Sequence, residues 1–544
     1  MYKPRNADNK LLQKGKKMKN IKKFIAILSV LAMLFAVGCS AQQAPEAAET
    51  DTSTSSEVSA PAEEADQTFT YVCGTEPSTL DPHMANATID GQMCLQISEP
   101  LVMRNQESEI VPWLAESWEA NEDGTVWTFK LRQDVTFTDG EPFNAEAVKY
   151  NFDRIGNPDT KSPKASIVRM IESTNVIDEY TVEFVLNTPC SVFLAQVSSY
   201  TCSMLSPKAC EEYGAEVGRN PVGTGPLMLK DWNYGSSLTF VRNDNYWGTP
   251  ATTEEVEVKI VAEDTSRVMM LKTGDADVIA NVPMVQIADL ESDSNVKVIL
   301  EEGYRTIFIG MTSGKVEELA DVRVRQAINH AIDQQTIIDT LLRGIATYPD
   351  SGMVSSVIDN SALGVGCYEY NVEKAKQLLA EAGYPNGFSI TLDTPEGRYA
   401  MDRQVAEVIQ AMLAEIGINV EINVLDWGAY TERGVNGEHE LFLLGMGCPT
   451  GDPEYNLYQN FGRGSQNYSF YTNELVDKLL EDQASIVDPD ARYDVMYQLQ
   501  KELVDDACAV PLYYEMQSYG CRSNVDGFIL YPNEIINLAY LVRN

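Results

Sequence analysis

The chain has 544 residues, with 41 Lys and Arg against 80 Asp and Glu, so its formal net charge is −39. A surface with that charge repels phosphate backbones, so no nucleic-acid binding is expected. A hydrophobic fraction of 44% and an aromatic fraction of 9% are enough for a packed core and exclude wholesale disorder. With only three histidines, neither a protein-built metal site nor a His-based catalytic triad is expected.

Residues 1–39 are predicted to be an export signal. Lysines precede an apolar run at 24–37, which is too short to span ~30 Å of hydrocarbon and has the length of a signal peptide's apolar region. The run ends in Ala36-Val37-Gly38-Cys39, which resembles the lipobox of bacterial lipoproteins and implies a lipid anchor on Cys39. An ordinary cleaved signal with an incidental cysteine is the alternative. The sequence leaves open whether translation starts at Met1 or at Met18.

Residues 40–67 are rich in Ala, Ser, Thr, Pro and acidic residues, and Val58 is their one bulky apolar side chain. Such a segment cannot offset the entropy lost on ordering, so a disordered acidic tether is predicted. The body at 68–544 contains no further membrane-spanning run and is too long for a single core, so it is expected to form two or more lobes. Nine cysteines follow Cys39; buried free thiols are preferred, although pairing stays open.

The region 370–450 predicts an α/β architecture. Helix-periodic and strand-like segments alternate there, which favours a right-handed, mostly parallel sheet. The first predicted helix is capped by Asn371, the second has an apolar stripe from Val405 to Ile416 and stops at Gly417, and a short third helix covers 427–435. The predicted strands are 389–393, 419–425 and 440–444. Since ligands of such sheets bind beyond the carboxyl ends of the strands, the sequence points to the loops 394–402, 426–428 and 445–456.

The N-terminal half has a different pattern. Segments 127–132, 181–186 and 237–242 alternate apolar and polar residues, as half-buried antiparallel strands do. Around 256–300, two strands and two helices indicate a second α/β unit. The predicted fold class is therefore α/β, with two lobes and an additional β-rich subdomain in the first lobe.

Several short motifs resemble the signature of solute-binding protein family 5, the extracytoplasmic receptors of ABC importers for peptides, nickel complexes and related solutes. Each motif is weak alone, but their order and spacing together are specific. The motifs are Leu80-Asp81-Pro82, Glu99-Pro100-Leu101, Pro112–Phe137 with its three tryptophans, Asn220–Pro226, Arg242–Trp247, Val324–Asp333 and Ala375–Pro385. We expect most of these residues to be structural, with the tryptophans filling core and Gly223 and Gly225 serving a tight turn.

The resemblance implies a two-lobed fold that closes over its ligand like jaws. The expected division is lobe I at 68–305, with the β-rich subdomain at about 92–215, lobe II at 306–512, and a return to lobe I at 513–544. It also implies a monomeric receptor that is not an enzyme and holds no cofactor or metal of its own. Its partners would be a short peptide or similar small solute, the membrane subunits of an ABC permease, and the membrane through Cys39.

Six residues are candidate ligand contacts. Tyr304 and Arg305 lie where the chain is expected to cross between lobes. Arg398 occupies the loop in which dipeptide-binding relatives carry an Arg that clamps the ligand carboxylate, and a solvated loop Arg is the alternative. Trp427 matches an aromatic residue that follows the central strand in relatives, where it either stacks on solute or packs in the core.

The third loop supplies Cys448 and Asp452. Cys448 either lines the pocket or is a buried, inert thiol. Asp452 either contacts the ligand or caps the next helix. Relatives that bind dipeptides carry an Asp for the peptide amine three residues earlier, where this chain has Pro449. The resemblance therefore supports the family more firmly than dipeptide specificity.

Two alternatives remain open. A nickel-chelate or haem receptor of the same fold would hold its metal through the chelator, because histidines are scarce. An exported hydrolase is the remote alternative, since the sequence lacks GxSxG, HExxH and P-loop motifs.

Overall fold

The structure is a computed structural model that describes residues 67–465 and 467–544. The predicted signal peptide at 1–39 and all of the predicted tether except Gln67 lie outside these residues, so lipidation of Cys39 stays a prediction. In the part of the chain that is described, no helix combines the length and apolar character needed to cross a membrane. The nine cysteines within it are all unpaired, and only Cys367 is not buried.

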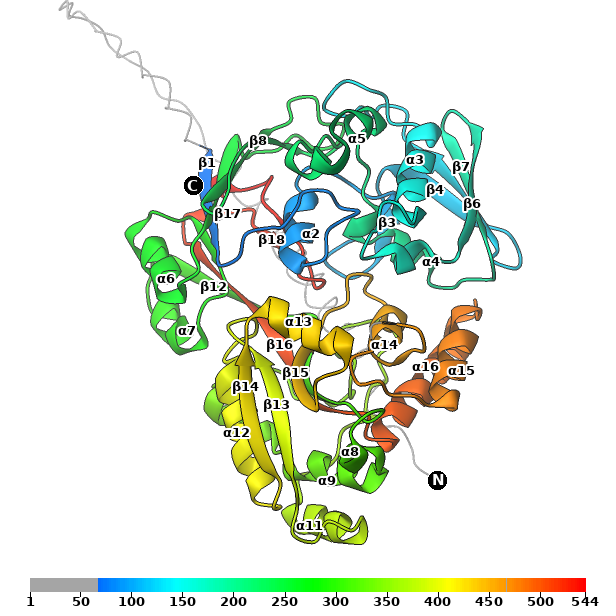
Figure 1. The fold of residues 1–544 in the computed structure, drawn as a ribbon. Coiled ribbons are helices and arrows are strands. Elements are labelled where there is room, and N and C mark those ends of the chain that lie inside the picture. The colour runs from blue at the N-terminus through cyan, green and yellow to red at the C-terminus, as the bar shows by residue number, and fades with distance from the viewer. Residues whose placement is uncertain (1–66, 466) are drawn as a thin grey trace, which may run out of the picture. The chain divides into compact units, whose positions relative to one another are not determined.

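Ten strands form one continuous mixed sheet, in the order β14-β13-β15-β12-β16-β11-β1-β10-β9-β8 (Figure 1). The strands are β1 (Thr68–Cys73), β8 (Leu227–Asn233), β9 (Ser237–Arg242), β10 (Glu255–Ile260), β11 (Val278–Ala280), β12 (Val296–Met311), β13 (Ser389–Pro395), β14 (Asn419–Leu425), β15 (Leu441–Met446) and β16 (Ala509–Arg522). We call the part that contains β1 and β8–β11 lobe I, and the part that contains β13–β15 lobe II.

Lobe II contains the predicted parallel sheet. Strand β13 pairs in parallel with both β14 and β15, as the alternation in 370–450 predicts. The Asn371 side chain accepts a hydrogen bond from the Lys374 N–H and caps helix α11, the first helix predicted in that region. The α-helices of this lobe are α8 (Glu317–Ala320), α9 (Val322–Ala331), α10 (Gln334–Thr336), α11 (Val372–Glu381), α12 (Asp402–Ala414), α13 (Trp427–Asn436), α14 (Pro453–Phe461), α15 (Glu474–Ala484) and α16 (Pro489–Asp505).

Lobe I contains the second α/β unit. Strand β1 pairs in parallel with β10 and β11, and β10, β9 and β8 continue as an antiparallel meander. Helices α6 (Asp264–Thr273) and α7 (Met284–Glu291) follow β10 and β11 in sequence. Gly274 ends α6 in the left-handed region at φ 86°, which favours glycine because it lacks a Cβ.

The predicted β-rich subdomain is a separate antiparallel sheet in the order β4-β5-β7-β6. Its elements are β4 (Ala115–Ala120), β5 (Val126–Leu131), α3 (Ala145–Gly156), β6 (Ile171–Asp178), β7 (Thr181–Leu186), α4 (Phe193–Val197) and α5 (Pro207–Tyr213). Phe184 packs edge-on against Phe129, Phe152 and Phe193, with ring centroids 4.7–5.5 Å apart. These aromatic contacts join the sheet to α3 and α4 in one core.

Four of the motif segments meet at one buried carboxylate. Glu99 accepts hydrogen bonds at 2.7–2.9 Å from the side chains of Trp113, Thr224, Tyr246 and Trp247. Burial raises the pKa of Glu99, and these four donors counteract that rise. The motifs from different parts of the sequence are therefore joined through a single side chain.

The nearby glycines are required by a close approach of two backbones. A Cβ on Gly223 would lie 2.3 Å from the Ile97 carbonyl oxygen, and a Cβ on Gly225 would lie 2.6 Å from it. The Gly225 N–H donates to that same carbonyl at 2.7 Å. These residues thus serve backbone packing, which is a more specific role than the tight turn that was expected.

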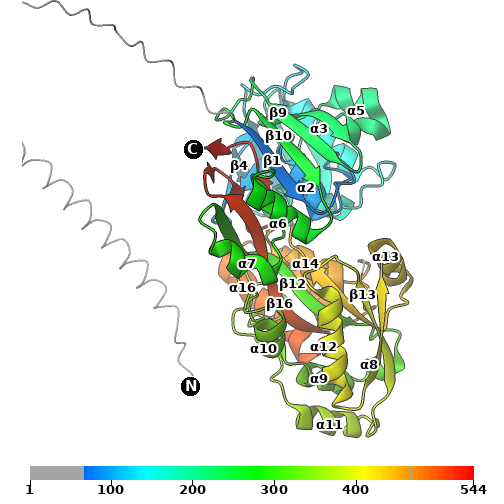
Figure 2. The same ribbon diagram turned by 90° about the vertical axis from the view of Figure 1, so that its left-hand side faces the viewer.

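The two lobes share the strands β12 and β16. Strand β12 pairs with β15 of lobe II, β16 pairs with β11 of lobe I, and the two strands pair with each other along their length. Figure 2 shows β16 running from the strands beside β1 into lobe II. The predicted lobe boundaries at 305 and 512 fall inside these strands.

Neutral His83 is predicted to make stability fall at mildly acidic pH. The Arg154 Nη1 lies 2.5 Å from His83 Nδ1, while His83 Nε2 lies 3.1 Å from the Ser203 carbonyl oxygen. Burial lowers the pKa of His83 to about 4, against about 6.5 in an unfolded chain. As the pH falls from about 6.5 towards 4, the unfolded state binds a proton that the folded state does not. This group should then remove up to about 1.4 kcal/mol of stability per pH unit.

Urea denaturation at several pH values between 4.5 and 7.5 measures this slope. The variant His83→Gln should lose the part of this slope that His83 causes, because glutamine does not titrate. An unchanged slope in His83→Gln would show that other groups cause the acid sensitivity.

Candidate ligand-binding site

The carboxyl ends of β13 and β14 bring Arg398 and Trp427 together. The Arg398 guanidinium carbon lies 5.1 Å from the centre of the Trp427 ring and 5.3 Å from that of Tyr399. Trp427 is 40% exposed and stacks on buried Tyr430 at 5.4 Å. Two residues that are 29 positions apart thus form one surface. It lies beyond the carboxyl ends of parallel strands, where ligands of such sheets bind.

The start of α12 shapes the loop that carries Arg398. The Asp402 carboxylate accepts hydrogen bonds from the backbone N–H groups of Arg398 and Tyr399 at 2.9 and 3.2 Å. Met401, just before α12, has φ 55°, a left-handed conformation that is uncommon for a residue with a side chain. The loop is therefore fixed by its backbone, and the Arg398 side chain is not used to hold it.

Arg398 is a half-buried cation without an ion-pair partner among the described residues. The two aromatic rings beside it attract the guanidinium through their π faces and restrict its orientation. Arg403, in the first turn of α12, is instead paired with Glu407 at 3.1 Å. The guanidinium fork of Arg398 is thus available for a carboxylate.

Arg305 lies at the crossing of the lobes and is only 7% exposed. Its Nε is 3.1 Å from Glu515 of β16, and its Nη2 is 2.6 Å from Glu534, which returns to lobe I. Nη2 also lies 3.1 Å from Thr88 Oγ1, at the start of α2 (Thr88–Cys94). Burial opposes the charge of Arg305, but the two carboxylates raise its pKa above the usual value. Arg305 is therefore already paired, unlike Arg398.

Tyr304 is 1% exposed and contacts lobe I directly. Its hydroxyl lies 2.6 Å from Ser108 Oγ, in the turn between β2 (Val102–Arg104) and β3 (Ile110–Pro112). Burial raises the pKa of Tyr304 to about 12, so the hydroxyl stays neutral. In this structure Tyr304 joins a lobe I hairpin to the crossing strand.

The 447–452 loop uses its polar side chains internally. Asp452 caps α14 by accepting from the Glu454 N–H, and both of its oxygens bind Arg492, at 2.7 and 2.8 Å. Cys448 is 3% exposed and its thiol donates to the Asp452 carbonyl at 3.2 Å. Burial raises the pKa of Cys448 to about 12, which keeps it an unreactive thiol. The structure thus gives both residues the structural alternatives named above, and their contact with ligand stays a prediction.

Sequence reasoning missed Glu515, Glu534 and Tyr399. Glu515 lies in the segment where a crossing was expected, so the crossing itself was a signal for it. Glu534 lies in a turn between two short strands, β18 (Ile529–Leu530) and β19 (Ile536–Asn537), that carry no clear pattern. Nothing in the sequence near Glu534 indicates its contact with Arg305.

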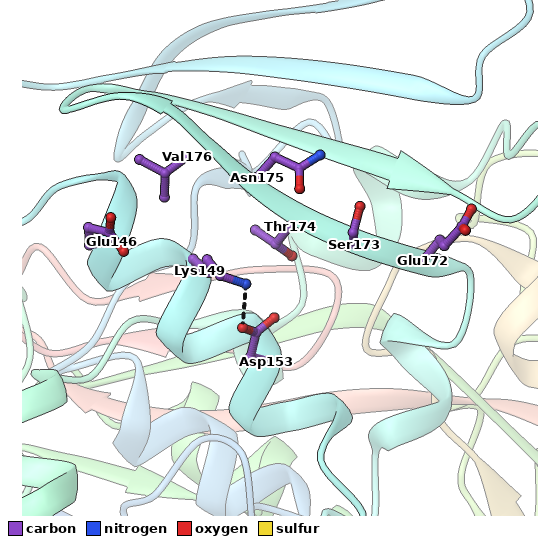
Figure 3. Close-up of a pocket in the computed structure, with 8 residues that line it drawn as sticks. All are labelled: Glu146, Lys149, Asp153, Glu172, Ser173, Thr174, Asn175 and Val176. Atoms are coloured by element: carbon purple, nitrogen blue, oxygen red, sulfur yellow. Dashed lines mark hydrogen bonds and ion pairs between the residues drawn. The ribbon is translucent and has the colours of Figure 1, made fainter.

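A surface groove of about 420 Å³ lies in the β-rich subdomain, away from these residues (Figure 3). Helix α3 contributes Glu146, Lys149 and Asp153, and strand β6 contributes 172–176. Lys149 and Asp153 pair with each other at 2.7 Å. None of the predicted ligand residues lines this groove.

Two α/β lobes that share a strand pair, with polar and aromatic side chains gathered at their junction, define a two-lobed solute receptor. The model of the bacterial extracellular solute-binding proteins, family 5, matches residues 109–468. The chain belongs to this family, which confirms the sequence-based prediction of a solute receptor of an ABC importer.

Relatives and solved structures agree with this family. The glutathione-binding protein GsiB of Salmonella typhi is 31% identical over 472 residues, covering 85% of this chain and 91% of the relative. The structure of DppA from Helicobacter pylori in complex with peptide STSA has a TM-score of 0.79 at 29% identity, over 88% of this chain and 98% of that chain. The structure of HbpA2 from Haemophilus parasuis has a TM-score of 0.75 at 28% identity, over 88% and 100%. The two-lobed fold is thereby confirmed.

The substitution Asp452→Asn should reduce stability far more than affinity for solute. Asparagine can still cap α14, but it leaves the buried Arg492 without a counter-charge. The free energy of unfolding should fall by about 3 kcal/mol, measured by chemical denaturation. Asp488→Asn is the matched control, because Asp488 caps α16 at an exposed position. Equal losses in the two variants would contradict the structural role of the Asp452–Arg492 pair.

Proposed function

We propose that the protein captures a short peptide, or a similar small solute with a carboxylate group, between its lobes and delivers it to the membrane subunits of an ABC permease. The observation that carries this proposal is the unpaired Arg398 guanidinium beside exposed Trp427 at the carboxyl ends of parallel strands. The receptor acts as a monomer and catalyses no reaction.

The chemistry of Arg398 fits this class of solute. A guanidinium fork binds a carboxylate through two parallel hydrogen bonds and keeps its charge when water is removed. Closure of the lobes would remove that water and strengthen the contact. Trp427 offers an apolar face next to the fork, which suits a side chain or backbone of the solute.

The relatives support the same class. GsiB is named a glutathione-binding protein, and the structure of DppA contains the peptide STSA. Glutathione and a tetrapeptide both carry free carboxylates and a free amino group. A shared chemistry of this kind matches a site built around an unpaired guanidinium.

The variants Arg398→Ala and Arg398→Lys should both weaken solute binding. Alanine removes a charged hydrogen-bond partner, which is worth about 1.5–3 kcal/mol, or a ten- to hundred-fold loss of affinity. Lysine keeps the charge but loses the bidentate fork, so Arg398→Lys should also lose affinity, though less than Arg398→Ala does. Calorimetric titration with glutathione, Met-Leu and Ser-Thr-Ser-Ala measures the effect.

Arg403→Ala is the control, because Arg403 is an exposed neighbour in α12 that is bound to Glu407. It should bind every solute as wild type does. Unaltered binding by Arg398→Ala would move the carboxylate site elsewhere. Stabilisation of wild type by a nickel–histidine complex alone, in a thermal-shift assay, would favour the metal-chelate receptor instead.

We further propose that the mature protein is anchored outside the cytoplasm by a lipid on Cys39, because the apolar run at 24–37 ends in the lipobox-like sequence Ala36-Val37-Gly38-Cys39. Metabolic labelling with a fatty-acid analogue should mark the wild-type protein and fail to mark Cys39→Ala. Cys367→Ala, at a partly exposed thiol of the body, is the control and should label as wild type. Equal labelling of wild type and Cys39→Ala would exclude the anchor.

A further inference from the structure

The acidic side chains around the junction of the lobes differ in whether they already bind other groups of the protein. A solute with a carboxylate at Arg398 and a free amino group needs an anion close by for that group. Most acidic side chains around the junction are committed to other groups of the protein. These committed residues are Glu302, Asp393, Asp402, Asp426, Asp452 and Glu454.

A different arrangement is the group formed by Arg305, Glu515 and Glu534, which lies where the strands cross between the lobes. Two carboxylates share one guanidinium there, so the group carries one negative charge that Arg305 does not balance when both carboxylates are ionised. The side chains of Glu515 and Glu534 are 23% and 15% exposed, whereas that of Arg305 is 8% exposed. The accessible part of the group is therefore mainly carboxylate.

Glu515 connects this group to the proposed carboxylate site. Burial and the neighbouring charge of Glu534 raise the pKa of Glu515, while the charges of Arg305 and Arg398 and the Ala400 N–H act to lower it. Ala400 belongs to the same loop as Arg398. Through Ala400, Glu515 therefore contacts the loop that carries Arg398.

Glu534 is held in position at a conformational cost. Its φ is 68°, in the left-handed region that is unfavourable for a residue with a Cβ. Gln92 Nε2 donates to the Glu534 carbonyl at 2.6 Å and fixes this turn from α2. Strain of this kind persists where the surrounding structure imposes it, and it concentrates at binding sites.

From these observations we infer that Glu515 and Glu534 together bind the free ammonium group of the solute while Arg398 binds its carboxylate. This inference rests on the proposed function and makes it more specific: the solute is a short zwitterion with both groups free. The ammonium group balances the extra negative charge of the cluster, and Glu534 contributes from lobe I while Arg398 contributes from lobe II. A zwitterion therefore contacts both lobes at once.

Amino-group acetylation tests this inference, because it removes the ligand's positive charge and leaves its carboxylate. Titration calorimetry compares glutathione and Ser-Thr-Ser-Ala with their N-acetylated forms. Wild type should bind the free-amine forms at least about ten-fold more tightly. Glu534→Gln and Glu515→Gln should weaken binding of the free-amine forms and abolish the difference between the two forms. Glu396→Gln, an exposed residue of the Arg398 loop, should retain the difference.

The acetylated ligands also separate recognition from folding. If the two glutamates only brace Arg305, each variant should lower the affinity for both forms of a ligand by the same factor, and the inference would be overturned. Equal affinity of wild type for both forms would overturn it as well, while leaving the carboxylate site at Arg398 intact. Absence of binding by every probe in either form would overturn the proposed function and this inference with it.

Discussion

The pairing of β12 with β16 is the constraint on which both lobes depend. These strands belong to a sheet that continues from lobe I into lobe II, so each lobe inherits its position from their register. The register shifts twice near the crossing, between Glu302 and Thr306 and between Ile307 and Phe308. At the first shift, the three residues 303–305 lie opposite the single residue Glu515. A bulge of this kind interrupts the ladder and bends the strand, which makes it the place where the pair deforms at least cost. Arg305 and its partner Glu515 lie in this bulge.

The charges at the bulge link the chain segments that meet there. Arg305 belongs to the first crossing strand, Glu515 to the second, and Glu534 to the C-terminal turn of lobe I. A buried ion pair adds little net stability, because desolvation cancels most of the attraction, but it disfavours arrangements that leave a charge unpaired. The same side chains can therefore fix the junction and respond to a charged solute. Tyr304 adds a neutral contact to the hairpin of lobe I at the next position.

Periodic segments of the fold were predictable, and contacts between distant turns were not. The strands β13, β14 and β15 were found because their apolar runs alternate with helical stripes, and their parallel order then placed Arg398 near Trp427. Glu534 gave no such signal, since it lies 229 residues from Arg305 and adopts a left-handed conformation without being glycine. The structural alternative for Asp452 could be stated from the sequence, but its partner Arg492, 40 residues further along the chain, could not.

The residues that carry the family resemblance and those that we propose to bind the solute form two different sets. Trp113, Thr224, Tyr246 and Trp247 meet at buried Glu99, and the nearby glycines permit two backbones to touch. These residues maintain the same fold for any solute, so they identify the family and give no information about its ligand. Arg398 lies in a loop, Glu534 in a turn, and Trp427 at the first residue of α13. At such positions side chains change without disturbing the core. Solute specificity in the proposed site therefore depends on the charges of these side chains, which the residues shared by the family do not determine.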